Sequence, residues 1–372
     1  MILPVVALSL FLLGQVGRLS FNQQEVNIYL YEIPYFLWII FLLWEKKNKY
    51  KLPKSVIIFL SVLIATFLFG IFSVSAYQNI VSFMYLIRVS LYLIGFGLTV
   101  VHFTQKEISA IYLKIFLTLL GVVGFVQYFF YSNLRNLQYL GWDPHLSRVF
   151  GQFLDTSVAG AIYGLILIFI LYNQKLFPKV TKYIFAAGYL FLGLFTYSRG
   201  YLASAFISAI SYSVAVKKNI KIALVTIVIL TAFGVLAPKP FGEGVNLLRT
   251  STIESRMADY NQGLKIWNKS PVVGVGYNRI RYFKSVVGEE LRRASHAGAS
   301  FHSTYLIVLV TAGVVGLGAF VYWLWTVAKI SNFAMISVLF LGVYSLFDNI
   351  LLHPFILFLW PVLIGVTSRR KQ

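Results

Sequence analysis

Residues 303–325 read STYLIVLVTAGVVGLGAFVYWLW, a run of 23 residues without a charged side chain. About 20 apolar residues suffice for an α-helix to cross a bilayer. Similar runs recur along the chain, with Gly, Pro and charged clusters between them. They fall at 2–17, 28–44, 55–77, 80–103, 108–131, 157–172, 183–197, 201–216, 220–237, 303–325, 331–347 and 350–366. The sequence therefore predicts an all-α polytopic membrane protein with about twelve transmembrane helices.

The composition agrees with a membrane protein. Of the 372 residues, 59% are hydrophobic and 12% are charged, whereas soluble domains carry about 25% charged residues. An ordinary cytosolic enzyme is therefore excluded. The absence of cysteine excludes disulfides, a thiolate nucleophile and a cysteine metal site. We expect one integral membrane domain over residues 1–372, whose first apolar run is a retained helix because no basic segment precedes it.

The basic residues predict the orientation in the membrane. The net charge of +20 would suit a nucleic-acid partner, but its distribution favours a membrane topology instead. With twelve spans, six basic groups and both termini share one side, which the positive-inside rule assigns to the cytoplasm. These groups are Lys46–Lys54, Lys106, Lys175–Lys182, Lys217–Lys221, Lys329 and Arg369–Lys371. We expect a multi-pass membrane protein with both termini in the cytoplasm, and no nucleic-acid partner.

The opposite, external side is rich in arginine. It carries a large loop, residues 238–302, between the ninth and tenth spans, with ten basic and five acidic residues. Arginine binds phosphate oxygens through two parallel hydrogen bonds, which lysine cannot form. The excess of arginine therefore indicates an external anionic ligand. The alternative, a surface that faces solvent or lipid headgroups, stays open.

An amphipathic helix is expected inside this loop. Apolar residues recur there at helical spacing, namely Ile253, Met257, Tyr260, Leu264 and Trp267. Pro271, Gly274 and Gly276 follow and would end the helix in a turn. We predict that this helix lies over the external mouth of the membrane domain.

Four external patches carry the candidate functional residues. They are Arg148-Val-Phe-Gly151-Gln-Phe153, Tyr197-Ser198-Arg199-Gly200, Glu254-Ser255-Arg256 and His302-Ser303. Each also has a simpler interpretation. An arginine beside a span often anchors to headgroups or snorkels, Arg256 could pair with Glu254, and His302 could merely hydrogen-bond a carbonyl group.

His302 is the sharpest candidate. At the start of a helix the dipole disfavours an imidazolium ion, so a neutral ring could accept a proton at pH 7. Gly313 and Gly316 share its face of the predicted helix. Such small residues would let another helix or a lipid chain approach beneath the histidine.

No metal or other cofactor is expected. The histidines do not pair with one another or with an acid at zinc spacing, and no Asp-x-Asp or Glu-x-Glu pair occurs in an external loop. Arginine would then neutralise a phosphate leaving group. Arg88 lies deep in the fourth span, where a charge is costly. It could contact a lipid phosphate, although an internal structural partner is slightly favoured.

Together these patches resemble the O-antigen ligase and polymerase family, membrane glycosyltransferases of the GT-C type. The ligase signature is His, then Asn, Ser or Gln, nine further residues, and Gly-x-x-Gly. Here it is His302, Ser303, residues 304–312 and Gly313-Val-Val-Gly316. The Arg148, Arg199 and Pro271-x-x-Gly274-x-Gly276 motifs follow the family's order, so the resemblance covers about 148–316. Two positions depart from it: Thr311 replaces a frequent acid, and Ser303 replaces the commoner Asn.

The resemblance implies a specific reaction. The protein would lie in the bacterial plasma membrane. The donor would be a glycan on undecaprenyl pyrophosphate, and the acceptor a hydroxyl of lipid A core or of another lipid-linked repeat unit. Transfer would invert the configuration without a metal, with a ligase slightly favoured over a polymerase. Arg199 and Arg256 match the arginines that hold the pyrophosphate, and His302 matches the proposed base. Arg148, Arg279 and Arg88 are further candidates for substrate contacts.

A polyisoprenoid-glycan flippase, or another secondary transporter, is the alternative. Such a protein would place its polar groups on broken helices near the bilayer midplane. The polar residues of this chain lie instead at the outer ends of the predicted spans, except for Arg88. The enzyme hypothesis requires that the arginines and the histidine converge at one external pocket.

Overall fold

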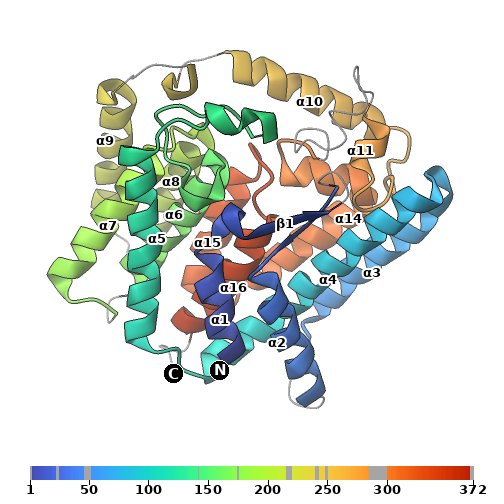
Figure 1. The fold of residues 1–372 in the computed structure, drawn as a ribbon, viewed down its shortest axis with the longest axis horizontal. Coiled ribbons are helices and arrows are strands. Elements are labelled where there is room, and N and C mark those ends of the chain that lie inside the picture. Colours follow the sequence, from blue (N-terminus) through green and yellow to red (C-terminus); the bar gives the residue numbers. More distant parts are fainter. Residues whose placement is uncertain are drawn as a thin grey trace. The chain divides into compact units, whose positions relative to one another are not determined.

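A computed structural model describes residues 2–21, 25–45, 52–140, 142–173, 176–214, 220–238, 243–247, 250–284 and 300–368. Helices dominate this part of the chain (Figure 1). They are α1 (Ile2–Phe11), α2 (Glu32–Glu45), α3 (Lys54–Phe69), α4 (Ala76–Gln105), α5 (Ala110–Phe130), α6 (Thr156–Tyr172), α7 (Lys179–Leu194), α8 (Arg199–Tyr212), α9 (Ile220–Leu236), α10 (Ser251–Trp267), α11 (Ile280–Phe283), α14 (Thr304–Ala328), α15 (Asn332–Tyr344) and α16 (Pro354–Ser368). Every predicted apolar run contains a helix, and α10 and α11 lie in the predicted external loop.

Several helices have the properties of membrane spans. Among the described residues, α4, α5 and α14 are long enough and apolar enough to cross a bilayer. Large apolar side chains also lie exposed at helix surfaces, for example Phe130 on α5 (85%) and Val228 on α9 (66%). Contiguous exposed apolar surface is rare in soluble proteins. The chain is therefore a helical membrane protein, and the number of twelve spans stays a prediction.

The expectation of an all-α chain is incomplete. Strands β1 (Arg18–Phe21) and β2 (Val26–Tyr29) form an antiparallel hairpin, in which Arg18 lies opposite Tyr29. A side chain of α4 stabilises it, because the Tyr85 hydroxyl donates to the Glu25 carbonyl (3.0 Å) and accepts from the Asn27 amide (3.3 Å). The strands are short and their contact with α4 is distant in the chain, so local periodicity predicted no strand here and placed the end of β2 in the apolar run 28–44.

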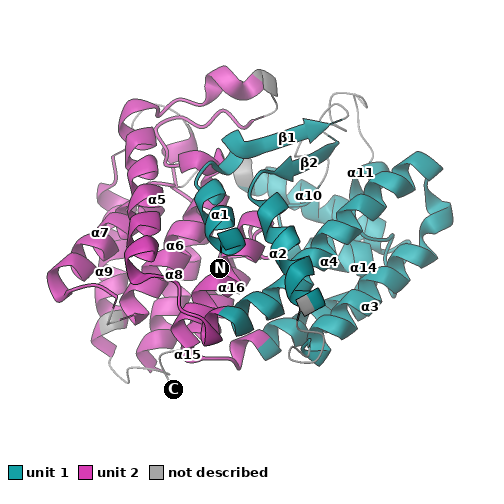
Figure 2. Ribbon diagram, turned by 60° about the horizontal axis from the view of Figure 1, so that its bottom comes forward, with its two compact units in different colours: residues 1–102, 251–326 teal, residues 103–250, 327–372 magenta. Residues whose placement is uncertain are grey.

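The chain divides into two compact units (Figure 2). Unit 1 comprises residues 1–102 and 251–326, and unit 2 comprises residues 103–250 and 327–372. Unit 1 therefore holds α1–α3, the hairpin, α10, α11 and most of α4 and α14. Unit 2 holds α5–α9, α15 and α16. The prediction of one integral membrane domain over the whole chain stays a prediction.

An aromatic cluster joins three helices of unit 1. Phe59 of α3 packs against Phe320 and Trp323 of α14, with ring centroids 5.4 and 6.2 Å apart. Phe96 of α4 contacts the same tryptophan at 5.4 Å. Because interacting aromatic pairs contribute beyond their buried area, this cluster holds α14 firmly against α3 and α4.

Unit 2 packs tyrosine side chains against glycines. An added Cβ at Gly160 of α6 would lie 2.6 Å from the Tyr344 hydroxyl, and one at Gly124 of α5 would lie 2.6 Å from the Tyr163 hydroxyl. Gly200 of α8 likewise faces the Tyr344 ring. Since protein interiors are close-packed, these glycines leave room for the tyrosine rings between neighbouring helices.

Candidate active site

In unit 1, His302 and Asp259 form a hydrogen-bonded pair. The His302 ring precedes α14, and its Nδ1 lies 2.8 Å from Oδ2 of Asp259 on α10. The His302 backbone N–H donates to the same oxygen at 3.0 Å. The His302 side chain remains 42% exposed, whereas that of Asp259 is 13% exposed. Two contacts to one carboxylate oxygen therefore orient a ring that solvent can still reach.

Lys284, directly after α11, holds the other oxygen of Asp259. Its Nζ lies 2.9 Å from Asp259 Oδ1 and also donates to the Ser300 carbonyl at 2.7 Å. Burial raises the pKa of Asp259, but hydrogen bonds from His302 and Lys284 outweigh burial and bring this pKa below its ordinary value. Asp259 is therefore an anion throughout the neutral pH range.

This geometry suits proton transfer. A carboxylate at Nδ1 favours the tautomer that carries its proton there, so the basic lone pair of the neutral ring lies on Nε2. A positioned imidazole of this kind can accept a proton from a hydroxyl. The carboxylate also stabilises the imidazolium that forms. The sequence identified His302 but missed Asp259, which is 43 residues away and was counted only among the acids of the loop.

Helix α10 confirms that a helix forms in the predicted external loop, but it packs on a different face from the predicted one. Most of the predicted apolar stripe is exposed, including Ile253 (52%), Met257 (60%) and Leu264 (40%). The packed face carries Asp259 and the buried Gly263, whose added Cβ would lie 2.8 Å from Leu306 of α14. Residues four apart share one face of a helix. A helical wheel centred on Gly263 would therefore have placed Asp259 on the packed face of α10.

Helix α14 is interrupted at Gly313, which has φ 65° and ψ −167°. The break leaves backbone N–H and C=O groups of α14 without partners inside the helix, and the turn that follows α10 supplies those partners. Two hydrogen bonds run in each direction between the turn and the break. They are Val275 N to Val310 O (3.0 Å), Gly276 N to Thr311 O (2.9 Å), Val314 N to Pro271 O (3.0 Å) and Val315 N to Val272 O (3.4 Å). We call this arrangement the glycine lock.

Three glycines of the lock leave no space for a side chain. An added Cβ at Gly313 would lie 2.0 Å from the Val272 carbonyl oxygen, and one at Gly274 (φ 67°) 2.5 Å from the Ala312 nitrogen. Gly276 (φ 93°) similarly faces Arg279. The expectation that Gly313 admits another helix or a lipid chain is therefore wrong, because the backbone of the turn occupies that place.

One part of the chain matches a known protein family. Residues 184–321 match the sequence model of a family described as O-antigen ligase. We call residues 184–321, which are similar to this family, the family domain. This confirms the resemblance found in the sequence, and the domain contains α10, the His302–Asp259 pair and the glycine lock. No curated protein matches the chain.

Arg279, inside the family domain, is bonded entirely within unit 1. It is 0% exposed. Its Nη1 donates to the carbonyls of Phe67 (3.0 Å) and Val275 (3.4 Å), and its Nη2 to Oδ1 of Asn79 (2.6 Å). Burial lowers the pKa of Arg279 to about 10. These contacts join the turn of the glycine lock to α3 and α4, so they favour a structural role over the predicted substrate contact.

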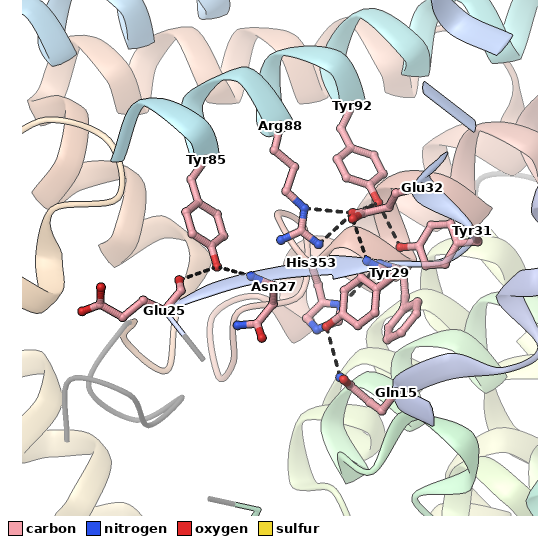
Figure 3. A network of polar contacts seen from close by, with 11 residues as sticks. Gln15, Glu25, Asn27, Tyr29, Tyr31, Glu32, Tyr85, Arg88, Tyr92 and His353 are labelled. Atoms are coloured by element: carbon pink, nitrogen blue, oxygen red, sulfur yellow. Dashed lines mark hydrogen bonds and ion pairs between the residues drawn. The ribbon is translucent and has the colours of Figure 1, made fainter. Parts of the chain in front are cut away.

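Arg88, outside the family domain, has an internal partner (Figure 3). Its Nε and Nη2 donate to Oε1 of Glu32 at 2.9 and 2.7 Å. The same oxygen accepts from the Tyr92 hydroxyl at 2.5 Å, while Oε2 accepts from the Tyr29 amide at 3.0 Å. The Glu32 side chain is 0% exposed. An internal structural role for Arg88 is therefore favoured over contact with a lipid phosphate.

We predict that Glu32→Gln destabilises the protein, because it leaves the Arg88 guanidinium without its carboxylate. Breaking a buried ion pair costs about 3–5 kcal/mol, which thermal unfolding in detergent would detect. The double variant Glu32→Gln with Arg88→Met removes both charges and should recover part of this loss. A single variant as stable as the native protein would contradict the assigned partner.

Two of the predicted patches meet in unit 2. Arg148 is 7% exposed, and its Nε donates to the Thr196 carbonyl at 2.8 Å. Thr196 lies three residues before Arg199, which begins α8. Ser198 caps that helix through the Tyr201 amide and accepts from the Tyr344 hydroxyl at 2.8 Å. The patch around Arg148 is thereby held against the turn that carries Arg199.

The candidate residues are distributed over both units. His302, Arg256, Arg279 and Arg88 belong to unit 1, while Arg148 and Arg199 belong to unit 2. Arg256 lies three residues before Asp259 on α10, so the two side chains leave the helix on the same side. The convergence of all these groups at one pocket stays a prediction. Within the ranges that the structure describes, no group of three or more His, Asp or Glu side chains is placed to hold a metal ion.

Proposed function

We propose that this protein transfers a glycan from undecaprenyl pyrophosphate to an acceptor hydroxyl on the external face of the plasma membrane, with His302 as the general base. The observation that carries the proposal is the hydrogen bond between His302 Nδ1 and Asp259 Oδ2. It lies inside the O-antigen ligase family domain. The family supports ligase or polymerase activity, and the pair supplies the base that such a reaction needs.

The proposed step is a single displacement. Nε2 of His302 takes the proton of the acceptor hydroxyl as its oxygen attacks the anomeric carbon. The bond from that carbon to the pyrophosphate oxygen breaks on the opposite face, so the configuration inverts. Asp259 stabilises the imidazolium. Arg256 and Arg199 neutralise the charge that develops on the departing pyrophosphate, without a metal ion.

The acceptor distinguishes a ligase from a polymerase. A ligase would use a hydroxyl of lipid A core, and a polymerase one of another lipid-linked repeat unit. The match to the histidine signature, from His302 to Gly316, slightly favours the ligase. Incubation of the purified protein and donor with each acceptor would decide between them.

The interrupted helix α14 is a feature that a flippase or other transporter would also show. In this chain the main-chain groups at the break are hydrogen-bonded to the turn after α10, which favours a rigid joint over a transport site. The test uses purified protein with lipid-linked glycan in detergent and in proteoliposomes. Formation of a new glycosidic bond would support the transferase hypothesis. Translocation of the glycan without such a bond would contradict it and support the transporter hypothesis.

We predict that Arg199→Ala and Arg256→Ala each weaken donor binding. Losing a hydrogen-bonded cation at a phosphate costs about 1.5–3 kcal/mol, or roughly tenfold or more in affinity. Titration of each variant with the lipid-linked donor measures this loss. Arg135, an exposed arginine that hydrogen-bonds Asn133 at 3.1 Å, is the matched control. Arg135→Ala should bind the donor like the native protein, and equal losses in all three variants would contradict specific roles.

A further inference from the structure

Arg281 is a buried arginine that differs from its neighbour Arg279. It lies on α11 and is only 7% exposed. Its Nε is buried and has no hydrogen-bond partner among the described residues. Arg279, two residues earlier, directs its terminal nitrogens to three oxygen acceptors. Nε of Arg279 is likewise buried without a hydrogen-bond partner in the described ranges. The two arginines differ in their terminal nitrogens, which form hydrogen bonds in Arg279 and form none among the described residues in Arg281.

A second donor in this segment is in the same condition. Nδ2 of Asn278 is buried without a hydrogen-bond partner in the part of the chain that the structure describes. Lys284 follows Arg281 by three residues, but Asp259 and the Ser300 carbonyl already accept from its ammonium group. Burying an unpaired charge or donor is costly. An anion at this segment would supply acceptors for both N–H donors.

We propose that residues 278–281 form a binding site for a phosphate group, with Arg281 as its cation and the Asn278 amide as a second donor. The guanidinium matches the geometry of phosphate oxygens. The phosphate belongs either to the pyrophosphate of the donor or to a phospholipid headgroup. The first source rests on the proposed function, and the second does not.

Stability and binding together test the site. Inorganic pyrophosphate should raise the unfolding temperature of the native protein in detergent, because a ligand of the folded state stabilises it. Arg281→Gln removes an uncompensated buried charge, so it should be at least as stable as the native protein yet lose the pyrophosphate effect. The matched variant Arg279→Gln loses internal hydrogen bonds and should be less stable.

The alternative is that a carboxylate of this chain neutralises Arg281. If Arg281 forms an internal ion pair with Glu289 or Glu290, which lie outside the described residues, Arg281→Gln would lower stability and keep the pyrophosphate effect. The double variant Glu289→Gln with Glu290→Gln would then reproduce the loss of stability. Either of these results would overturn the phosphate site.

Two titrations identify the source of the phosphate. One uses undecaprenyl pyrophosphate in detergent, and the other uses nanodiscs that contain phosphatidylglycerol. We expect Arg281→Gln to weaken binding of one of these lipids about tenfold or more, and native affinity for both would overturn the inference. The titrations are repeated in a His302→Ala background, where no transfer is expected. Failure of the phosphate site is thereby separated from failure of the proposed reaction.

Discussion

Replacing His302 by alanine is expected to abolish glycan transfer and to leave the donor bound. A positioned general base contributes about 10²–10⁴-fold to a rate, and no other described residue contacts Asp259 through an imidazole ring. Asp259→Asn should also slow transfer, by about 10²-fold, because an amide no longer selects the tautomer with its proton on Nδ1. Single-turnover rates and donor titrations measure the two effects separately.

Glu254 supplies the control for this prediction. It is an exposed acid in the first turn of α10, five residues before Asp259. Glu254→Gln should transfer glycan at the native rate, which separates the role of Asp259 from a general loss of negative charge on the helix. If His302→Ala transferred glycan at the native rate, His302 would not be the general base.

The lowered pKa of Asp259 adds a pH dependence of stability. A carboxyl group whose folded-state pKa lies below its unfolded value stabilises the fold above the unfolded value, and this contribution is lost as the pH falls through the folded value. The contacts of Asp259 with His302 and Lys284 should therefore persist through neutral and mildly acidic pH. Acid unfolding profiles of the native protein and Asp259→Asn should diverge above the ordinary carboxyl pKa and converge in stronger acid.

Gly313→Ala is expected to be the most destabilising substitution in α14. The residue has φ 65° and ψ −167°, a conformation that costs a non-glycine residue about 1–3 kcal/mol. In addition, its Cβ would lie 2.0 Å from the Val272 carbonyl oxygen, so the turn and the helix must separate. We expect a total loss of about 3 kcal/mol or more, together with loss of transfer, because the turn links α10 to α14.

Gly318 provides a control in the same helix. An added Cβ there meets nothing within 4 Å, and alanine in a helix interior is favoured over glycine by about 0.5–1 kcal/mol. Gly318→Ala should therefore be as stable as the native protein or slightly more stable in thermal unfolding. Equal unfolding temperatures for the Gly313 and Gly318 variants would show that the glycine lock is not needed for stability.

Local sequence signals located the helices and part of the candidate site. Each apolar run contains a helix because apolar content and length are properties of contiguous residues. His302 and the glycine motifs were found because their spacing along the chain matches the family signature. The order of these motifs indicated the O-antigen ligase family, which the comparison of residues 184–321 confirms.

The partners of these residues were decided only by the tertiary structure. Asp259 is 43 residues from His302, and Glu32 is 56 residues from Arg88. No local periodicity encodes such pairs, because they depend on which helix faces pack together. The same is true of the glycine lock: its glycines are visible in the sequence, but its four hydrogen bonds join main-chain atoms, so the spacing of the glycines does not show which segments pair. The amino-acid sequence by itself determined where helices form and which residues could react; the packing of distant backbone and side chains decided what holds each of them in place.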